Sequence, residues 1–94
     1  MARGTGRTTK QIQEAPKGAV YVWVSHDLWY PRKLAHELGR GDIEFVPPSW
    51  LDSWDKFAGR RLSGLVLDHA VALREDQWDR YRIAISRVEP YQGD

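Results

Sequence analysis

The sequence predicts a small α/β protein: a three-stranded parallel sheet in the order 2-1-3, with helices on both faces and a flexible N-terminal tail. Strand-like runs alternate with helix-like runs along the 94 residues, which is the pattern of βαβ units. A helix connects each strand to the next, so neighbouring strands should be parallel and joined by right-handed crossovers. The run 19–24 is the most continuously apolar segment, and it therefore belongs in the centre of the sheet.

The first half of the folded region predicts a strand, a helix and a second strand. Residues 19–24 are β-branched or aromatic apart from one alanine, as in a strand buried on both faces. A helix is expected over 28–38, because Pro31 suits a first turn and Gly39 suits the position after the last turn. The second strand covers 43–46 and is ended by two prolines.

The second half predicts a short helix, a third strand and a last helix. These elements cover 48–57, 62–67 and 75–88. Apolar residues in the last helix recur at helical spacing and predict one buried face. That face consists of Trp78, Tyr81, Ile85 and Val88.

Length and charge predict one domain over 18–94, preceded by a basic tail over 1–17. The tail has four basic residues and one acidic residue, which gives it a net charge of +3. Because the whole chain has a net charge of +1, the remaining domain carries −2. A nucleic-acid contact is therefore expected only through the tail, and weakly. The absence of cysteine fits a reducing cytoplasm, and no apolar run is long enough for a membrane span.

Two polar groups follow the first and third strands: Ser25, His26 and Asp27, then Asp68 and His69. Ligands of such sheets bind beyond the carboxyl ends of the strands, where the strand order reverses. Three uses are open: a divalent metal site, a Ser-His-Asp hydrolase site, or an anion at a helix N-terminus. Helix capping and turn formation explain the same residues more simply. We therefore treat them as candidate ligand-binding residues and assign no catalytic residue, metal ligand or cofactor.

Five tryptophans in so short a chain exceed what a small core needs. Partly exposed tryptophan is enriched at binding surfaces, so an interaction surface is expected around the 48–57 helix and the adjoining charged turn. Its candidate residues are Trp29, Trp50, Trp54, Phe57, Arg60 and Arg61.

The segments 21–27, 33–39 and 65–69, together with a tryptophan-bearing last helix, resemble small uncharacterised α/β proteins of tailed phages of actinobacteria. The resemblance covers residues 19–88. It implies no particular activity, but it implies a phage accessory protein that binds a host component in the host cytoplasm.

The function expected from the sequence is thus a non-catalytic protein-interaction module that binds a host protein, with a homodimer as a further expectation. A small-ligand or metal site at the sheet edge, with hydrolytic activity, is the first alternative. Weak nucleic-acid binding through the basic tail is the second.

Overall fold

The computed structural model describes residues 5–53 and 62–88. It contains a three-stranded parallel sheet in the order β2-β1-β3, which confirms the predicted architecture. Strand β1 (Val20–Val22) lies in the centre, between β2 (Glu44–Val46) and β3 (Leu65–Leu67). In register, Tyr21 stands opposite Phe45 on one side and Val66 on the other.

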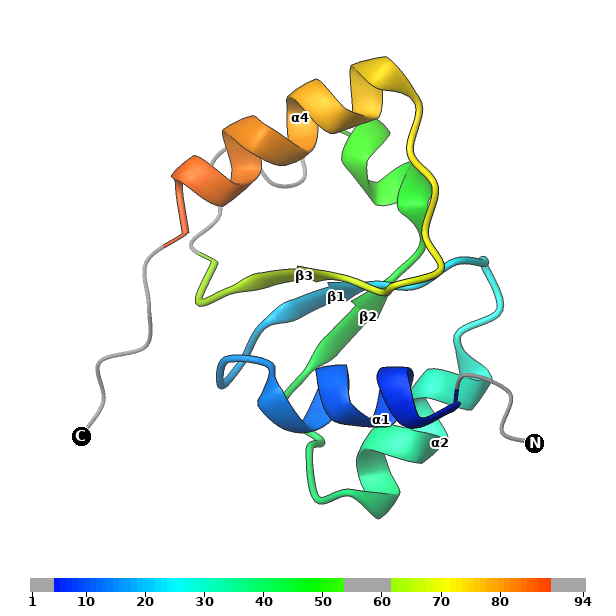
Figure 1. The fold of residues 1–94 in the computed structure, drawn as a ribbon. Helices are drawn as coiled ribbons and strands as arrows, with labels where there is room; N and C mark the ends of the chain where they lie inside the picture. The colour runs from blue at the N-terminus through cyan, green and yellow to red at the C-terminus, as the bar shows by residue number, and fades with distance from the viewer. Residues whose placement is uncertain (1–4, 54–61, 89–94) are drawn as a thin grey trace.

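Helices cover both faces of the sheet, as Figure 1 shows. Helices α1 (Thr5–Glu14) and α2 (Trp29–Glu37) lie on one face. The 3-10 helix η1 (Pro48–Asp52) and helix α4 (Glu75–Ser86) lie on the other. Successive side chains of a strand point to opposite faces, so each strand contributes to both layers.

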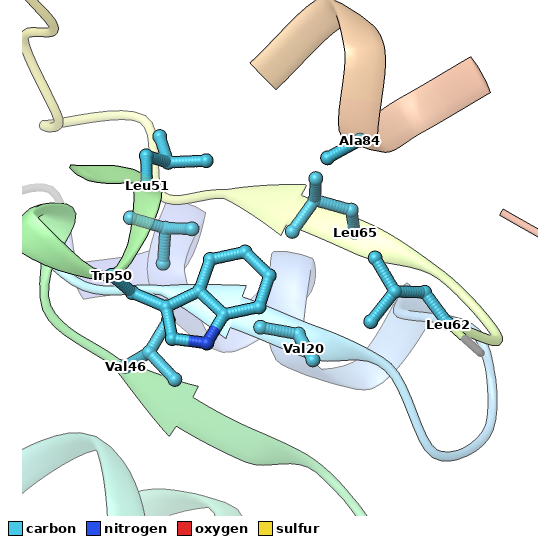
Figure 2. Close-up of a cluster of buried hydrophobic side chains, with 8 residues drawn as sticks. Val20, Val46, Trp50, Leu51, Leu62, Leu65 and Ala84 are labelled. Carbon is cyan, nitrogen blue, oxygen red and sulfur yellow. The ribbon is translucent and has the colours of Figure 1, made fainter. Parts of the chain in front are cut away.

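The layer beneath η1 and α4 contains the larger apolar cluster. Figure 2 shows the Trp50 indole inside it, beside Val20 and Val46 from the two neighbouring strands. Its buried members are Val20, Val22, Val46, Trp50, Leu51, Leu62, Leu65 and Ala84.

In the layer beneath α1 and α2, the structure differs from the predicted N-terminal tail over 1–17, because part of that tail is a packed helix. Residues 5–14 form α1, and Ile12 on this helix is fully buried in the second apolar cluster. The C-terminal end of α1 is held by Arg40, whose guanidinium donates to the carbonyl oxygens of Ile12 and Ala15 at 2.9 and 3.0 Å. Residues 1–4 of the predicted tail lie outside the described residues.

The first strand is shorter than predicted. Trp23 N–H donates to the Val46 carbonyl at 2.8 Å, the last bond of this ladder. The next donor from this side of β2 would be Pro48, which has no N–H, and β3 ends at Leu67. Val24 therefore lies past the sheet and is 41% exposed, contrary to the buried position predicted for it. Helix α2 ends at Glu37, one residue before the predicted end, and Gly39 follows its C-cap as predicted, with a φ of 73° that favours glycine.

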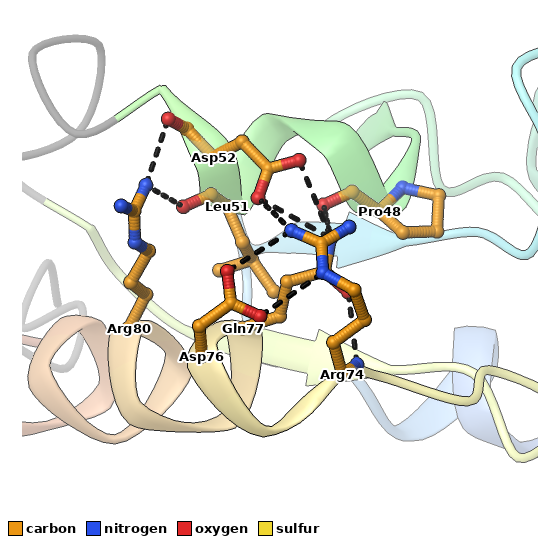
Figure 3. Close-up of polar contacts among 7 residues, drawn as sticks. All are labelled: Pro48, Leu51, Asp52, Arg74, Asp76, Gln77 and Arg80. Carbon is orange, nitrogen blue, oxygen red and sulfur yellow. Dashed lines mark hydrogen bonds and ion pairs between the residues drawn. The ribbon is translucent and has the colours of Figure 1, made fainter.

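Polar contacts fasten α4 to η1 (Figure 3). The Arg74 guanidinium binds Asp52 at 2.8 Å and Asp76 at 3.0 Å. The Gln77 amide donates to the Pro48 carbonyl, and Arg80 donates to the carbonyls at the end of η1.

These contacts change which face of α4 is buried. Gln77 and Ala84 point into the molecule, whereas Trp78 and Ile85 are 37% and 38% exposed. The prediction that Trp78 and Ile85 form the buried face is therefore wrong, although Tyr81 packs against the core as expected.

Candidate functional site

The residues after β1 form a local turn that begins α2. The Ser25 hydroxyl oxygen accepts the Asp27 N–H at 2.9 Å, and the Asp27 carboxylate accepts the Trp29 N–H at 3.1 Å. His26 is exposed beside them. Each acceptor bonds the N–H two residues further along, which is the turn-forming role typical of serine and aspartate. The N-cap residue of α2 is Leu28, which has no side-chain cap.

Asp68, after β3, is the centre of a buried polar cluster that reaches across to α1. We call the buried residues Thr8, Tyr21 and Asp68, together with the exposed His69 at their edge, the buried carboxylate cluster. The Tyr21 hydroxyl donates to Asp68 Oδ1 at 2.6 Å, and the Thr8 hydroxyl donates to the same oxygen at 3.2 Å. The Ala70 N–H donates to Oδ2 at 3.1 Å. Asp68 is 3% exposed, and these three donors compensate for its loss of water.

Tyr21 and His69, two other members of this cluster, lie close to the Asp68 carboxylate. Burial, followed by the hydrogen bond to Asp68, raises the pKa of Tyr21 well above its usual range. His69 Nε2 lies 3.2 Å from the Thr8 hydroxyl and 4.0 Å from Asp68 Oδ2. The Gln11 side chain accepts the backbone N–H of His69 at 2.8 Å and donates to the Leu67 carbonyl at 2.8 Å. The cluster therefore fastens α1 to the end of β3.

A shallow pocket of about 250 Å³ adjoins His69 on the outer side of α1. It is lined by Arg7, Lys10, Gln11, Glu14 and His69. Arg7 and Lys10 are exposed, so two of the basic residues expected in a tail stand on a helix beside this pocket.

The two polar groups predicted to converge are each engaged with their own surroundings. Within residues 5–53 and 62–88, no hydrogen bond or ion pair joins Ser25, His26 or Asp27 to Asp68 or His69. In the same residues no three His, Asp or Glu side chains are grouped so that they could hold a metal ion. The cluster around Asp68 contains a carboxylate, an imidazole and hydroxyl groups. Thr8 and Asp68 are buried, so this hydroxyl and this carboxylate are not open to solvent.

The predicted interaction residues separate into three groups. Trp50 is 8% exposed and belongs to the core, so its predicted exposure is corrected. Trp29 is 66% exposed on the first turn of α2. The remaining four, Trp54, Phe57, Arg60 and Arg61, lie outside the described residues.

Trp29 is one of three exposed apolar side chains in the segment 24–30, and we call Val24, Trp29 and Tyr30 together the aromatic surface. Tyr30 is 44% exposed and Val24 is 41% exposed. The half-buried Trp23 ring lies 5.9 Å from the Tyr30 ring, centroid to centroid. Lys33 Nζ lies 5.3 Å from the Trp29 ring centroid and 3.7 Å from a Glu37 carboxylate oxygen.

Sequence reasoning missed Thr8 and Tyr21, which belong to the buried carboxylate cluster, and Gln11, which bonds the His69 backbone. Tyr21 was placed only as a strand residue, and the other two fell within the predicted tail. Thr8 and Ile12 in α1, and Ala15 directly after it, are all buried, but with Ile12 as the one large apolar residue among them their spacing is too weak a pattern to predict a helix.

Neither a protein-family model, a curated protein nor a solved structure matches the chain. No helix in the described part of the chain has the length and apolar content needed to cross a bilayer.

Proposed function

We propose that the protein is a non-catalytic interaction module that binds a partner protein through the aromatic surface. The observation that carries the proposal is the 66% exposure of Trp29, in a short segment that also exposes Val24 and Tyr30. Tryptophan and tyrosine are the residues most enriched among the energetic hot spots of interfaces. In line with the resemblance to phage accessory proteins, the partner we propose is a protein of an actinobacterial host.

The local structure supports this use because it restrains Trp29 before any partner arrives. Asp27 fixes the backbone of Trp29 through its N–H. Lys33 stands over the indole and is itself paired with Glu37. An anchor that is already positioned loses less conformational entropy on binding than a mobile one. Ser25 and Asp27, first considered for ligand binding, thereby contribute to the surface by building the turn beneath it.

The test is affinity capture from an actinobacterial lysate, followed by calorimetry with the purified partner. Trp29→Ala should weaken binding by about 30-fold or more, the factor that corresponds to a hot spot of about 2 kcal/mol. The melting temperature should change little, because the indole is mostly in water in the free protein.

The matched control is Trp78→Ala, which removes a partly exposed tryptophan from α4 on the other face of the sheet. Binding by the aromatic surface predicts that this variant keeps its affinity. Equal affinity of the wild type and Trp29→Ala for the captured protein, or a loss of affinity only with Trp78→Ala, would contradict the proposal.

A further inference from the structure

A second apolar area lies on α4, away from the aromatic surface. Trp78 and Ile85 are seven residues apart and therefore share one side of the helix. Both are more than a third exposed. Tyr81, between them, stands edge-on to Trp78 with the ring centroids 5.7 Å apart. We call these three residues the α4 flank. It lies beside the face that packs on the core, where Gln77 and Ala84 are buried.

The two halves of α4 differ in charge. The first half has Glu75, Asp76, Asp79 and Arg80 and carries a net −2, and the second half has only Arg82 and carries +1.

Two of these charged side chains already serve the contacts with η1: Asp76 binds Arg74, and Arg80 holds carbonyl oxygens of η1. Asp79 and Arg82 pair with each other along the helix, with both side chains 69% exposed. An exposed pair of this kind contributes little to stability, so each member can exchange its partner at small cost.

A second copy of the same helix fits this surface in only one direction. Antiparallel packing places the acidic half of one α4 opposite the basic half of the other, whereas parallel packing places like charges together. A two-fold axis near the middle of the flank also sets Trp78 of one copy against Ile85 of the other, twice over.

We propose that the protein forms a homodimer through antiparallel packing of its two α4 flanks. A helix of twelve residues is about 18 Å long. The contact is therefore at the small end of specific interfaces, and the dimer dissociates in the micromolar to millimolar range. This surface is separate from the aromatic surface, so dimer formation leaves Trp29 available to another protein.

Sedimentation velocity of the full chain, from about 10 μM to about 1 mM, spans the range of such weak interfaces. The wild type should shift from monomer to dimer across it. Ile85→Asp should weaken the dimer by about 30-fold or more, as expected for an interface anchor.

The matched control is Ile83→Asp, which makes the same change at a residue that is 41% exposed but on a different side of α4. It should alter the dimerisation constant by no more than about twofold, the usual size of a surface substitution effect. Circular dichroism of both variants verifies that each remains folded.

Charge-altered chains test the complementarity. An acidic α4 (Arg82→Glu) and a basic α4 (Glu75→Lys/Asp79→Lys) should each stay monomeric alone and form a heterodimer when mixed.

Orientation can be read with a spin label on Glu75→Cys, because the chain has no cysteine of its own. Antiparallel packing puts the two labels at opposite ends of the interface, and parallel packing puts them side by side.

Three outcomes would each overturn the proposal. They are a wild type that stays monomeric at every concentration, equal effects of Ile83→Asp and Ile85→Asp on dimerisation, and two spin labels that lie close together. The first result would assign the flank to a different protein.

Discussion

Replacing Ile12 with alanine measures whether α1 belongs to the folded domain. The Ile12 side chain is fully buried between α1 and the sheet. Truncating a buried isoleucine removes apolar contacts and leaves a cavity, which together cost about 2–4 kcal/mol. The cavity should collapse only in part, because Arg40 and Gln11 still hold the helix by hydrogen bonds at its end and middle. Urea unfolding followed by circular dichroism should show a lower midpoint with an unchanged slope.

Gln13→Ala is the control, since Gln13 is the next residue along and is exposed. It should shift stability by less than about 0.5 kcal/mol, as surface substitutions do. A flexible tail predicts the same small effect for both variants. An Ile12→Ala protein that unfolds at the wild-type urea concentration would therefore refute the placement of α1.

Three further substitutions test contacts that hold the layers together. Tyr21→Phe removes the shortest hydrogen bond of the buried carboxylate cluster and should cost about 1.5–3 kcal/mol in chemical denaturation, the range for bonds to charged acceptors. The Arg40 guanidinium, followed by the Gly18 N–H, holds the pKa of Asp42 below its usual range. The folded protein therefore binds fewer protons there than the unfolded chain, and the stability gap between wild type and Asp42→Asn should narrow as the pH falls below about 4. Gly64→Ala places a Cβ 2.7 Å from the Pro16 ring and should lower stability by about 1–3 kcal/mol in urea titrations, as overpacking does.

The sheet and its order could be predicted because their signals are local and strong. The run around β1 is apolar on both faces, so it could only be central. Pro31 and Gly39 mark the beginning and end of α2 through backbone geometry that few other residues satisfy as well. Strand lengths were less predictable, because a strand can extend only as far as the neighbouring strands pair with it. Val24 lies beyond the last paired residues of both β2 and β3.

Helix α1 could not be predicted from its own residues, because its main attachments come from elsewhere in the chain. It offers one large buried apolar side chain, Ile12, and its other residues are those of a polar tail. What fixes it is Arg40, which is 28 residues from Ile12, and Asp68, which is 60 residues from Thr8. Contacts at such separation leave no periodic pattern in a local window.

Which tryptophans are exposed could not be predicted either, because exposure depends on how each helix is rotated about its own axis. The volume argument predicted that some indoles must be exposed, but it could not choose between Trp29 and Trp50. On α4, exchanging the buried side chain between Gln77 and Trp78 requires a turn of only about 100° around the helix axis. In the observed rotation the Gln77 amide reaches the Pro48 carbonyl and the Asp52 side chain. The burial of a glutamine thus accompanies the partial exposure of Trp78, the residue that we propose contacts a second copy of the chain.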